Sequence, residues 1–156
     1  MNFDPPEAVR PLLDRIETFI ADVVMKAEST VLDNGFAASG PLLDDLRAQC
    51  KAQKMWGPQI PQELGGLGLG LVEHGLVSER LGRTPIGHYV FGAQAPDAGN
   101  IEILHKYGTP EQKERWLEPL AHGKIRSCFS MTEPENPGSN PTMMSCRAVR
   151  SGDDYV

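Results

Sequence analysis

The sequence predicts an α+β chain, in which an all-helical unit (residues 1–123) precedes the first strands of a β unit (residues 124–156). Apolar residues recur at helical spacing through much of the first unit. After Gly123 two stretches have extended character, and Ser151-Gly152-Asp153-Asp154 resembles a hairpin turn. The two units therefore differ in kind, with the boundary near residue 123.

Two amphipathic helices are expected near the amino terminus. Apolar residues at three- and four-residue intervals predict a helix over Pro11–Ala27. A second helix is expected over Pro41–Lys54, because Leu42, Leu46 and Cys50 share one side. The following residues, Met55–Leu71, are dense in proline and glycine and predict an irregular connection.

Further helix signals follow. A helical pattern returns from Val72 to Leu81, and Thr84-Pro85 is a start signal for another helix. Thr109-Pro-Glu-Gln112 is the clearest signal, because it offers an N-cap hydroxyl, a proline at the first helical position and a glutamine that completes a capping box. The helix that it opens is expected to end at Gly123 and to direct three residues inward: Trp116, Leu117 and Leu120.

The β unit is expected to contain extended stretches at Ile125–Thr132 and Arg147–Val156. A single hairpin with a long loop is only marginally stable alone. Because the sequence stops at Tyr155-Val156, within an expected strand, we expect the natural protein to continue beyond it.

The composition excludes several function classes. The chain of 156 residues, 40% hydrophobic and 23% charged, has the make-up of a soluble globular protein. A net charge of −6 argues against nucleic acid or an anionic membrane as the main partner. No apolar stretch approaches the length of a membrane span. The amino terminus lacks a signal peptide and the three cysteines are widely spaced, which together predict a cytoplasmic protein.

Several tempting motifs have structural interpretations. Gly65–Gly70 contains no G-x-G-x-x-G, and no Gly-Lys-Ser/Thr follows it, so we interpret it as a turn between helices. The histidines and cysteines lack the spacing of metal ligands. Cys128, Trp116 and the Met55-Trp56 pair are expected to pack in the core.

Cys128–Pro141, with the sequence CFSMTEPENPGSNP, changes from an expected strand into a loop of prolines and polar side chains. Such a loop presents backbone N–H groups and short hydroxyls in one direction, which suits a flat heteroaromatic ligand with an anionic group nearby. The alternative is a capped turn in which Thr132 and Ser139 bond their own backbone. Residue chemistry alone leaves both interpretations open.

Four motifs, in this order, resemble the amino-terminal part of the acyl-CoA dehydrogenases, flavoenzymes that oxidise acyl-CoA thioesters at Cα–Cβ. They are Pro61–Leu69, Gly108–Leu117, Phe129–Ser139 and Gly152–Val156. The resemblance covers essentially the whole chain and implies a helical amino-terminal domain followed by a middle β domain. It favours the ligand-binding interpretation of Cys128–Pro141.

One departure from the commonest family pattern points to a branch. Glu135-Asn136-Pro137 places three residues, in place of two, before Gly138-Ser139, and Asn140 replaces an aspartate. Together with Ala95–Asn100 and Trp116–Pro119, this resembles the branch whose animal members are often fused to a phosphotransferase-like domain. That branch is associated with longer or hydroxylated acyl chains, so the resemblance leaves the acyl chain length open.

The resemblance implies FAD as the cofactor and assigns six residues to its site. These residues are Phe129, Ser130, Met131, Thr132, Gly138 and Ser139. The Thr132 hydroxyl is expected near flavin N5, and Ser139 is expected to meet the acyl-CoA as well. Gly138 is expected to need a backbone conformation that disfavours a side chain. In the family a glutamate from a carboxyl-terminal helical bundle is the catalytic base, so no catalytic residue is expected in this chain.

Glu133 is therefore not expected to be the base. Adjacent strand residues point to opposite faces, so Glu133 points away from the flavin if Thr132 points towards it. We expect its carboxylate to bond its own loop or a neighbouring domain.

The implied reaction is the oxidation of an acyl-CoA to the trans-2-enoyl-CoA, with hydride transfer to flavin N5. The implied partners are the acyl-CoA, an electron-transferring flavoprotein or similar acceptor, and further copies in a homodimer or homotetramer. Two alternatives are a non-catalytic interaction module and an acyl-CoA oxidase, which passes electrons to oxygen. The 156-residue chain alone is expected to be inactive and to hold FAD poorly.

Overall fold

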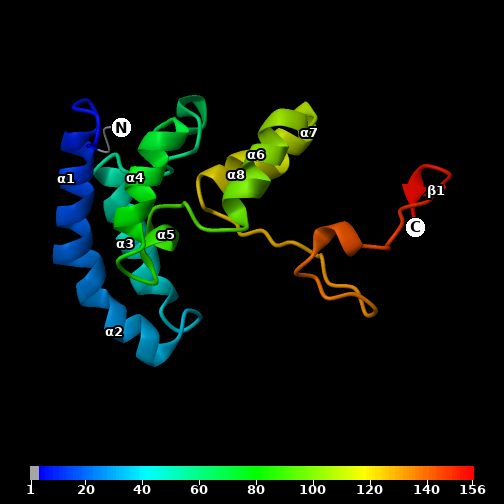
Figure 1. The fold of residues 1–156 in the computed structure, drawn as a ribbon, viewed down its shortest axis with the longest axis horizontal. Coiled ribbons are helices and arrows are strands. Elements are labelled where there is room, and N and C mark those ends of the chain that lie inside the picture. Colours follow the sequence, from blue (N-terminus) through cyan, green and yellow to red (C-terminus); the bar gives the residue numbers. More distant parts are fainter. Residues whose placement is uncertain (1–3) are drawn as a thin grey trace.

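The computed structural model describes residues 4–156 and shows two adjacent groups of helices, from which the carboxyl-terminal segment extends (Figure 1). The predicted α+β class is confirmed, because the longer helices all precede residue 122 and the described residues form strands only near the carboxyl terminus. The first group comprises α1 (Arg10–Phe19), α2 (Met25–Asn34), α3 (Gly40–Ala52), α4 (Leu71–Leu81) and α5 (Gly87–Val90). The second comprises α6 (Asp97–Tyr107), α7 (Pro110–Gln112) and α8 (Glu118–Ala121).

Helices α1 and α2 are joined by a π-helical turn (Ile20–Val24) and run as one helix, longer than the predicted Pro11–Ala27. Its apolar face is fully buried at Ile16, Ile20 and Val24, as the helical spacing predicts. Gly35, with φ of +79°, ends the helix.

The main core lies among the helices of the first group. Phe91 is completely buried and meets Phe19 edge to face, with ring centroids 5.9 Å apart. The Phe91 carbonyl also accepts a hydrogen bond of 2.8 Å from the amide of Gly57. The irregular connection after α3 is thereby tied to the core.

The second group begins at α6, a helix that the sequence analysis did not identify. The capping box predicted at α7 is confirmed: the Gln112 amide donates to Thr109 Oγ1 at 3.3 Å, and the Thr109 amide donates to Gln112 Oε1 at 2.9 Å. A π-helical turn (Lys113–Leu117) continues α7 into α8, and Gly123 follows the helix end with φ of +63°.

The core position predicted for Trp116 is wrong. Its side chain is 41% exposed, whereas Leu117 and Leu120 are buried as predicted. The indole lies under the Arg115 guanidinium and lines an open hollow of about 330 Å³ with Ile103 and Ile125. The helical spacing placed Trp116 beside the buried face, but Trp116 lies in the π-helical turn, where the regular α-helical spacing does not apply.

Trp56 joins the two helical groups. It is buried, as is Met55, which confirms the core position predicted for both. Its Nε1 donates to the carbonyl of Ala121 at 2.9 Å, and the Arg47 guanidinium lies 5.0 Å from the ring centroid. A Cβ at Gly123 would approach this ring to 2.8 Å, so a glycine is needed at the junction.

The glycine stretch forms a turn, as predicted. The amides of Gly65 and Gly66 donate to the carbonyls of Gln62 and Pro61, and the amide of Leu67 donates to that of Gly57. Gly65 and Gly68 adopt positive φ of +82° and +62°. Because these amides already have partners, they are not free to bind a phosphate.

The carboxyl-terminal segment makes a single hairpin, of strands β1 (Arg150–Ser151) and β2 (Asp154–Tyr155). Gly152 and Asp153 form its loop, which confirms the predicted turn. The predicted strand at 125–132 is wrong for the described chain, where no neighbouring strand supplies partners. Cys128 is consequently exposed and not packed in the core.

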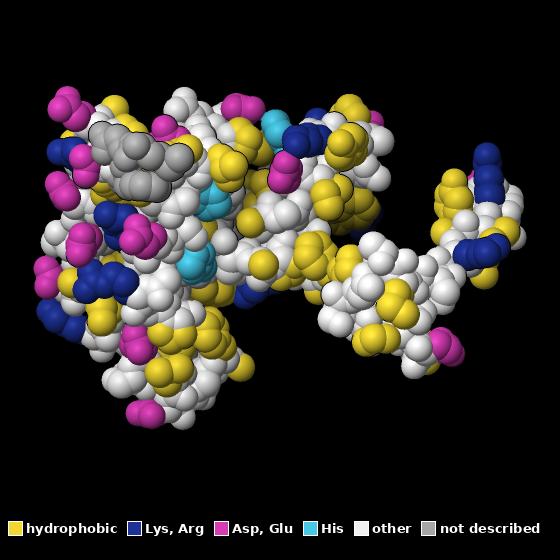
Figure 2. Space-filling model, viewed as in Figure 1, with side chains coloured by type: hydrophobic (Ala, Val, Ile, Leu, Met, Phe, Trp, Pro, Cys, Tyr) yellow, Lys and Arg dark blue, Asp and Glu magenta, His cyan; other side chains and the backbone are white. Residues whose placement is uncertain are grey.

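Acidic and basic side chains are interspersed over the first helical group, and apolar side chains are exposed on both groups (Figure 2). None of the helices in residues 4–156 is both long enough and apolar enough to cross a membrane.

Candidate functional site

The six residues assigned to a cofactor lie on one exposed segment beyond the helical groups (Figure 1). Phe129 is 52% exposed, and Ser130, Thr132 and Ser139 are exposed as well. Met131 and Gly138 are half-buried. The structure thus presents four of these six side chains to solvent, where a ligand can reach them.

The segment folds back so that Gly138 lies beside Thr132. A Cβ built at Gly138 would lie 3.6 Å from both Thr132 Oγ1 and the carbonyl oxygen of Met131. These distances are ordinary contacts, and Gly138 is not among the residues with positive φ. The expectation that Gly138 needs a conformation reserved for glycine is therefore wrong. A Cβ would fit at this position beside Met131-Thr132.

The backbone from Cys128 to Thr132 carries free donors. Within residues 4–156, none of these five amides donates a hydrogen bond, and neither does the Thr132 hydroxyl. An exposed phenyl ring at Phe129 lies on the same stretch. Free amides, a hydroxyl and an aromatic ring fit the edge and face of a flavin ring, the group that the resemblance implies.

Glu133 points the other way. It is buried to 6% exposure, whereas Thr132, the preceding residue, is exposed. Its carboxylate accepts hydrogen bonds from the amides of Ser145 (2.9 and 3.0 Å) and Cys146 (2.6 Å) and from Asn136 Nδ2 (2.9 Å). The Ser145 hydroxyl adds a further bond of 3.0 Å. Glu133 therefore closes the loop that carries Gly138 and Ser139.

These donors stabilise the charged carboxylate. The Ser145 amide, the Asn136 side chain and the Cys146 amide lower the pKa of Glu133 from 4.5 to about 2. Its carboxylate faces donors of its own loop and holds its proton only in strong acid, which makes it unsuited to accept a proton from a substrate at neutral pH.

The closed loop should therefore respond to acid. Because the pKa of Glu133 is lower in the folded chain, loop closure is fully stabilised above about pH 4.5 and is lost as the pH falls towards about 2. Amide chemical shifts of Ser145 and Cys146, followed by NMR from pH 6 to pH 2, should report this transition. Shifts that stay constant over that range would contradict it.

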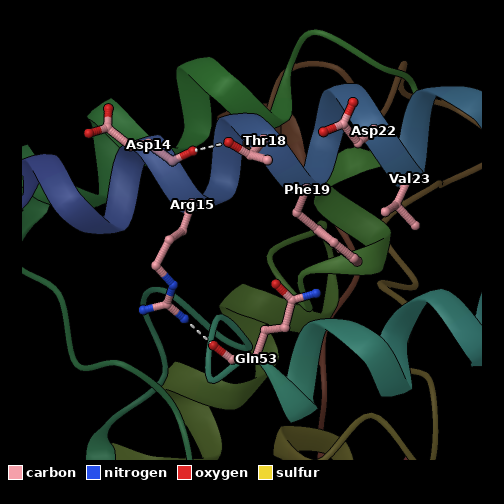
Figure 3. A pocket seen from close by; sticks show the side chains of 7 residues that line it. All are labelled: Asp14, Arg15, Thr18, Phe19, Asp22, Val23 and Gln53. Atoms are coloured by element: carbon pink, nitrogen blue, oxygen red, sulfur yellow. Dashed lines mark hydrogen bonds between the residues drawn. The ribbon is translucent and has the colours of Figure 1, made fainter.

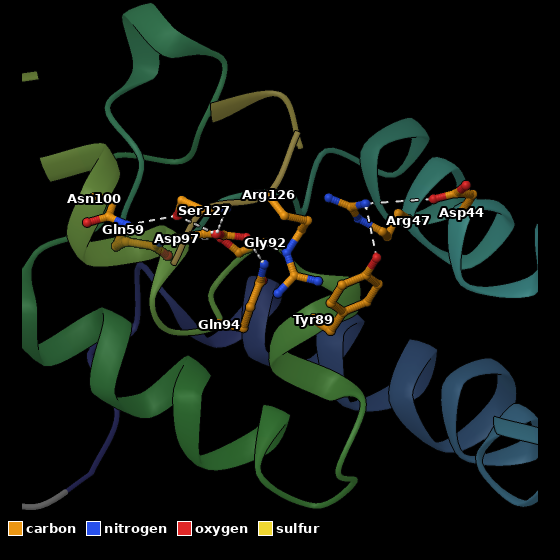
Figure 4. A network of polar contacts seen from close by, with 10 residues as sticks. All are labelled: Asp44, Arg47, Gln59, Tyr89, Gly92, Gln94, Asp97, Asn100, Arg126 and Ser127. Atoms are coloured by element: carbon orange, nitrogen blue, oxygen red, sulfur yellow. Dashed lines mark hydrogen bonds and ion pairs between the residues drawn. The ribbon is translucent and has the colours of Figure 1, made fainter. Parts of the chain in front are cut away.

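A second buried carboxylate, Asp97, lies at the start of α6 and was not identified from the sequence (Figure 4). Its Oδ1 accepts from the Ser127 amide at 2.8 Å and the Ser127 hydroxyl at 2.6 Å. Its Oδ2 accepts from Arg126 Nε at 2.8 Å and from Gln94 Nε2 at 2.5 Å. Burial disfavours the charged form of Asp97, but the Ser127 hydrogen bonds and the Arg126 charge outweigh it and lower the pKa.

Comparison with known proteins decides the family. The family described as "Acyl-CoA dehydrogenase, N-terminal domain" matches residues 6–124. The chain belongs to the acyl-CoA dehydrogenase family. Its match covers the whole helical part, including the glycine turn and the α7 capping box, so the resemblance drawn from motifs is confirmed.

Relatives within the acyl-CoA dehydrogenases include the animal branch. Acyl-CoA dehydrogenase family member 11 from Gallus gallus is 44% identical over 116 residues, which are 74% of this chain and 14% of that protein. Family member 10 from Mus musculus is 37% identical over 158 residues, covering 96% of this chain and 15% of that protein. The structure of an acyl-CoA dehydrogenase from Mycobacterium abscessus is 40% identical with a TM-score of 0.87, and covers 98% of this chain and 41% of that one.

The chain therefore spans less than half the length of these acyl-CoA dehydrogenases.

Another open hollow, of about 330 Å³, lies between α1 and the end of α3 (Figure 3). There the Thr18 hydroxyl bonds the Asp14 carbonyl and the Arg15 guanidinium bonds the Gln53 carbonyl. Its polar groups serve the fold, so we assign no function to this hollow.

Proposed function

We propose that this protein oxidises an acyl-CoA thioester to the trans-2-enoyl-CoA with FAD as cofactor, and that residues 129–139 form part of the flavin site. Family membership supports the reaction class. The observation that carries the assignment is the exposed stretch Cys128–Thr132, whose amides are free and beside which Gly138 packs.

Each residue has a proposed role. FAD supplies the hydride acceptor of such a reaction, at N5. The Thr132 hydroxyl donates a hydrogen bond at the flavin edge, and the free amides of the same stretch stabilise negative charge on the ring carbonyls. Phe129, Ser130 and Met131 line the ring. Gly138 and Ser139 continue the site, and Ser139 also meets the acyl-CoA.

The catalytic base lies outside the described residues in this proposal. Glu133, the carboxylate nearest to Thr132, is occupied by the backbone amides of Ser145 and Cys146. An electron-transferring flavoprotein or a similar protein takes the electrons, and the protein works as a homodimer or homotetramer.

Thr132→Val tests the flavin assignment. Valine keeps the shape of threonine and removes the hydroxyl. In the natural protein, as isolated with its flavin, the variant should raise the activation free energy of flavin reduction by about 1–3 kcal/mol, because a buried acceptor loses its donor. Stopped-flow absorbance of the flavin after acyl-CoA is added gives the rate.

Thr30→Val is the matched control, because Thr30 is exposed on α2, distant from the segment. It should leave flavin reduction unchanged. Equal reduction rates and equal flavin spectra for wild type and Thr132→Val would place the hydroxyl away from the cofactor.

A further inference from the structure

Two buried carboxylates bracket the segment that carries all six proposed flavin residues. Asp97 is 3% exposed and holds residues 126 and 127, just before that segment. Glu133 is 6% exposed and holds residues 145 and 146, just after it. They are the two acidic residues buried in the described chain, and both bind backbone N–H groups of the segment's ends.

The Asp97 contact fixes where the segment leaves the helices. One carboxylate oxygen takes both the amide and the hydroxyl of Ser127, and Asn100 Nδ2 donates to the same hydroxyl at 2.9 Å. The other oxygen pairs with Arg126, whose guanidinium stacks 4.9 Å from the Tyr89 ring centroid on α5 (Figure 4). The chain at 126–127 is thus tied to α5 and α6 together.

No later hydrogen bond ties the segment to the helices. Among residues 4–156, every hydrogen bond made by residues 128–156 stays within those residues. The direction of Cys128–Thr132 therefore depends on the hydrogen bonds that residues 126 and 127 make to Asp97. The path of the returning loop depends on the bonds that Glu133 accepts. One further side-chain bond supports each end, from Asn100 Nδ2 to the Ser127 hydroxyl at 2.9 Å and from Asn136 Nδ2 to the Ser145 hydroxyl at 3.2 Å, but only the two carboxylates accept from the backbone amides there.

We propose that Asp97 and Glu133 are positioning residues that hold the two ends of the flavin-facing segment, Asp97 against the helices and Glu133 across the loop. The identity of the ligand rests on the proposed function; the holding of the segment does not. Each carboxylate accepts N–H groups with both oxygens, which an amide side chain cannot do, because one of its two terminal atoms is a donor.

The experiment compares Asp97→Asn and Glu133→Gln with two matched controls, Asp22→Asn and Glu135→Gln. The control residues are exposed, and Glu135 lies in the same loop as Glu133. Arg126→Met removes the Asp97 partner at a half-exposed position, and provides a second test should Asp97→Asn fail to fold.

Two measurements are made on each protein. Hydrogen–deuterium exchange of the chain without flavin should be about tenfold faster or more at the Ser127 amide in Asp97→Asn and Arg126→Met, and at the Ser145 and Cys146 amides in Glu133→Gln, with α1–α4 unchanged. In the natural protein loaded with FAD, the cofactor should dissociate about tenfold faster in all three variants. The visible flavin spectrum should also shift in them and in neither control.

Unchanged exchange at both ends would overturn the proposal. Faster exchange with unaltered FAD dissociation and flavin spectrum would overturn the positioning role. A natural protein that takes up no FAD would contradict the proposed function, whereas the exchange comparison would still decide whether the two carboxylates hold the segment.

Discussion

Phe91→Ala is expected to lower the free energy of unfolding by about 3–5 kcal/mol, the usual cost of emptying a phenylalanine site in a core. Phe91 has no exposed surface and lies where α5 meets the α1–α2 helix, with the Phe19 ring against it. Neighbouring helices cannot collapse into the space without moving the backbone that bonds Gly57. Urea unfolding followed by circular dichroism at the helix band measures the loss.

Phe36→Ala is the matched control for the loss of a phenyl ring. Phe36 is 46% exposed and makes one edge-to-face contact with Tyr89, at 5.5 Å between centroids. Its removal should cost about 1 kcal/mol, the value of an aromatic pair. Similar losses for the two variants would show that Phe91 does not organise the core.

Local signals predicted the helical part well. The capping box at Thr109 and the helix end at Gly123 follow from side-chain chemistry within a few residues, which tertiary packing does not override. The α1–α2 helix was expected because its apolar spacing is strong. Helix α6 was missed because its apolar residues, such as Ile101 and Leu104, are few and its surface is mixed.

The candidate site was only partly predictable. Motif order identified the segment, and Glu133 was expected to point away from Thr132, although the strand on which that expectation was based does not form. The role of Asp97 was not visible, because it depends on Arg126 and Ser127, which are distant in sequence. The Pro96-Asp97 pair, a helix-start pattern, was the signal that could have drawn attention to it.

Gly66→Ala should destabilise the fold by about 3 kcal/mol, at the upper end of the cost of overpacking. A Cβ at Gly66 would lie 2.1 Å from the carbonyl oxygen of Ile60 and 2.4 Å from its Cβ. Ile60 is 1% exposed and packs in the core of the second helical group, so it cannot yield. The turn must open instead, which breaks hydrogen bonds such as that from Leu67 to Gly57.

Gly75→Ala provides a control of the opposite sign. Gly75 lies inside α4, and a Cβ there meets nothing within 4 Å. Alanine should raise the free energy of unfolding by about 0.5–1 kcal/mol, because it limits the unfolded backbone and favours the helix. Thermal unfolding of both variants tests the pair.

If Gly66 served a phosphate ligand, its replacement would leave the ligand-free protein as stable as wild type. An unfolding midpoint for Gly66→Ala equal to that of wild type would contradict the structural interpretation of the glycine turn. A lower midpoint for Gly66→Ala together with a higher midpoint for Gly75→Ala would show that glycine is needed at residue 66 because of the Ile60 backbone.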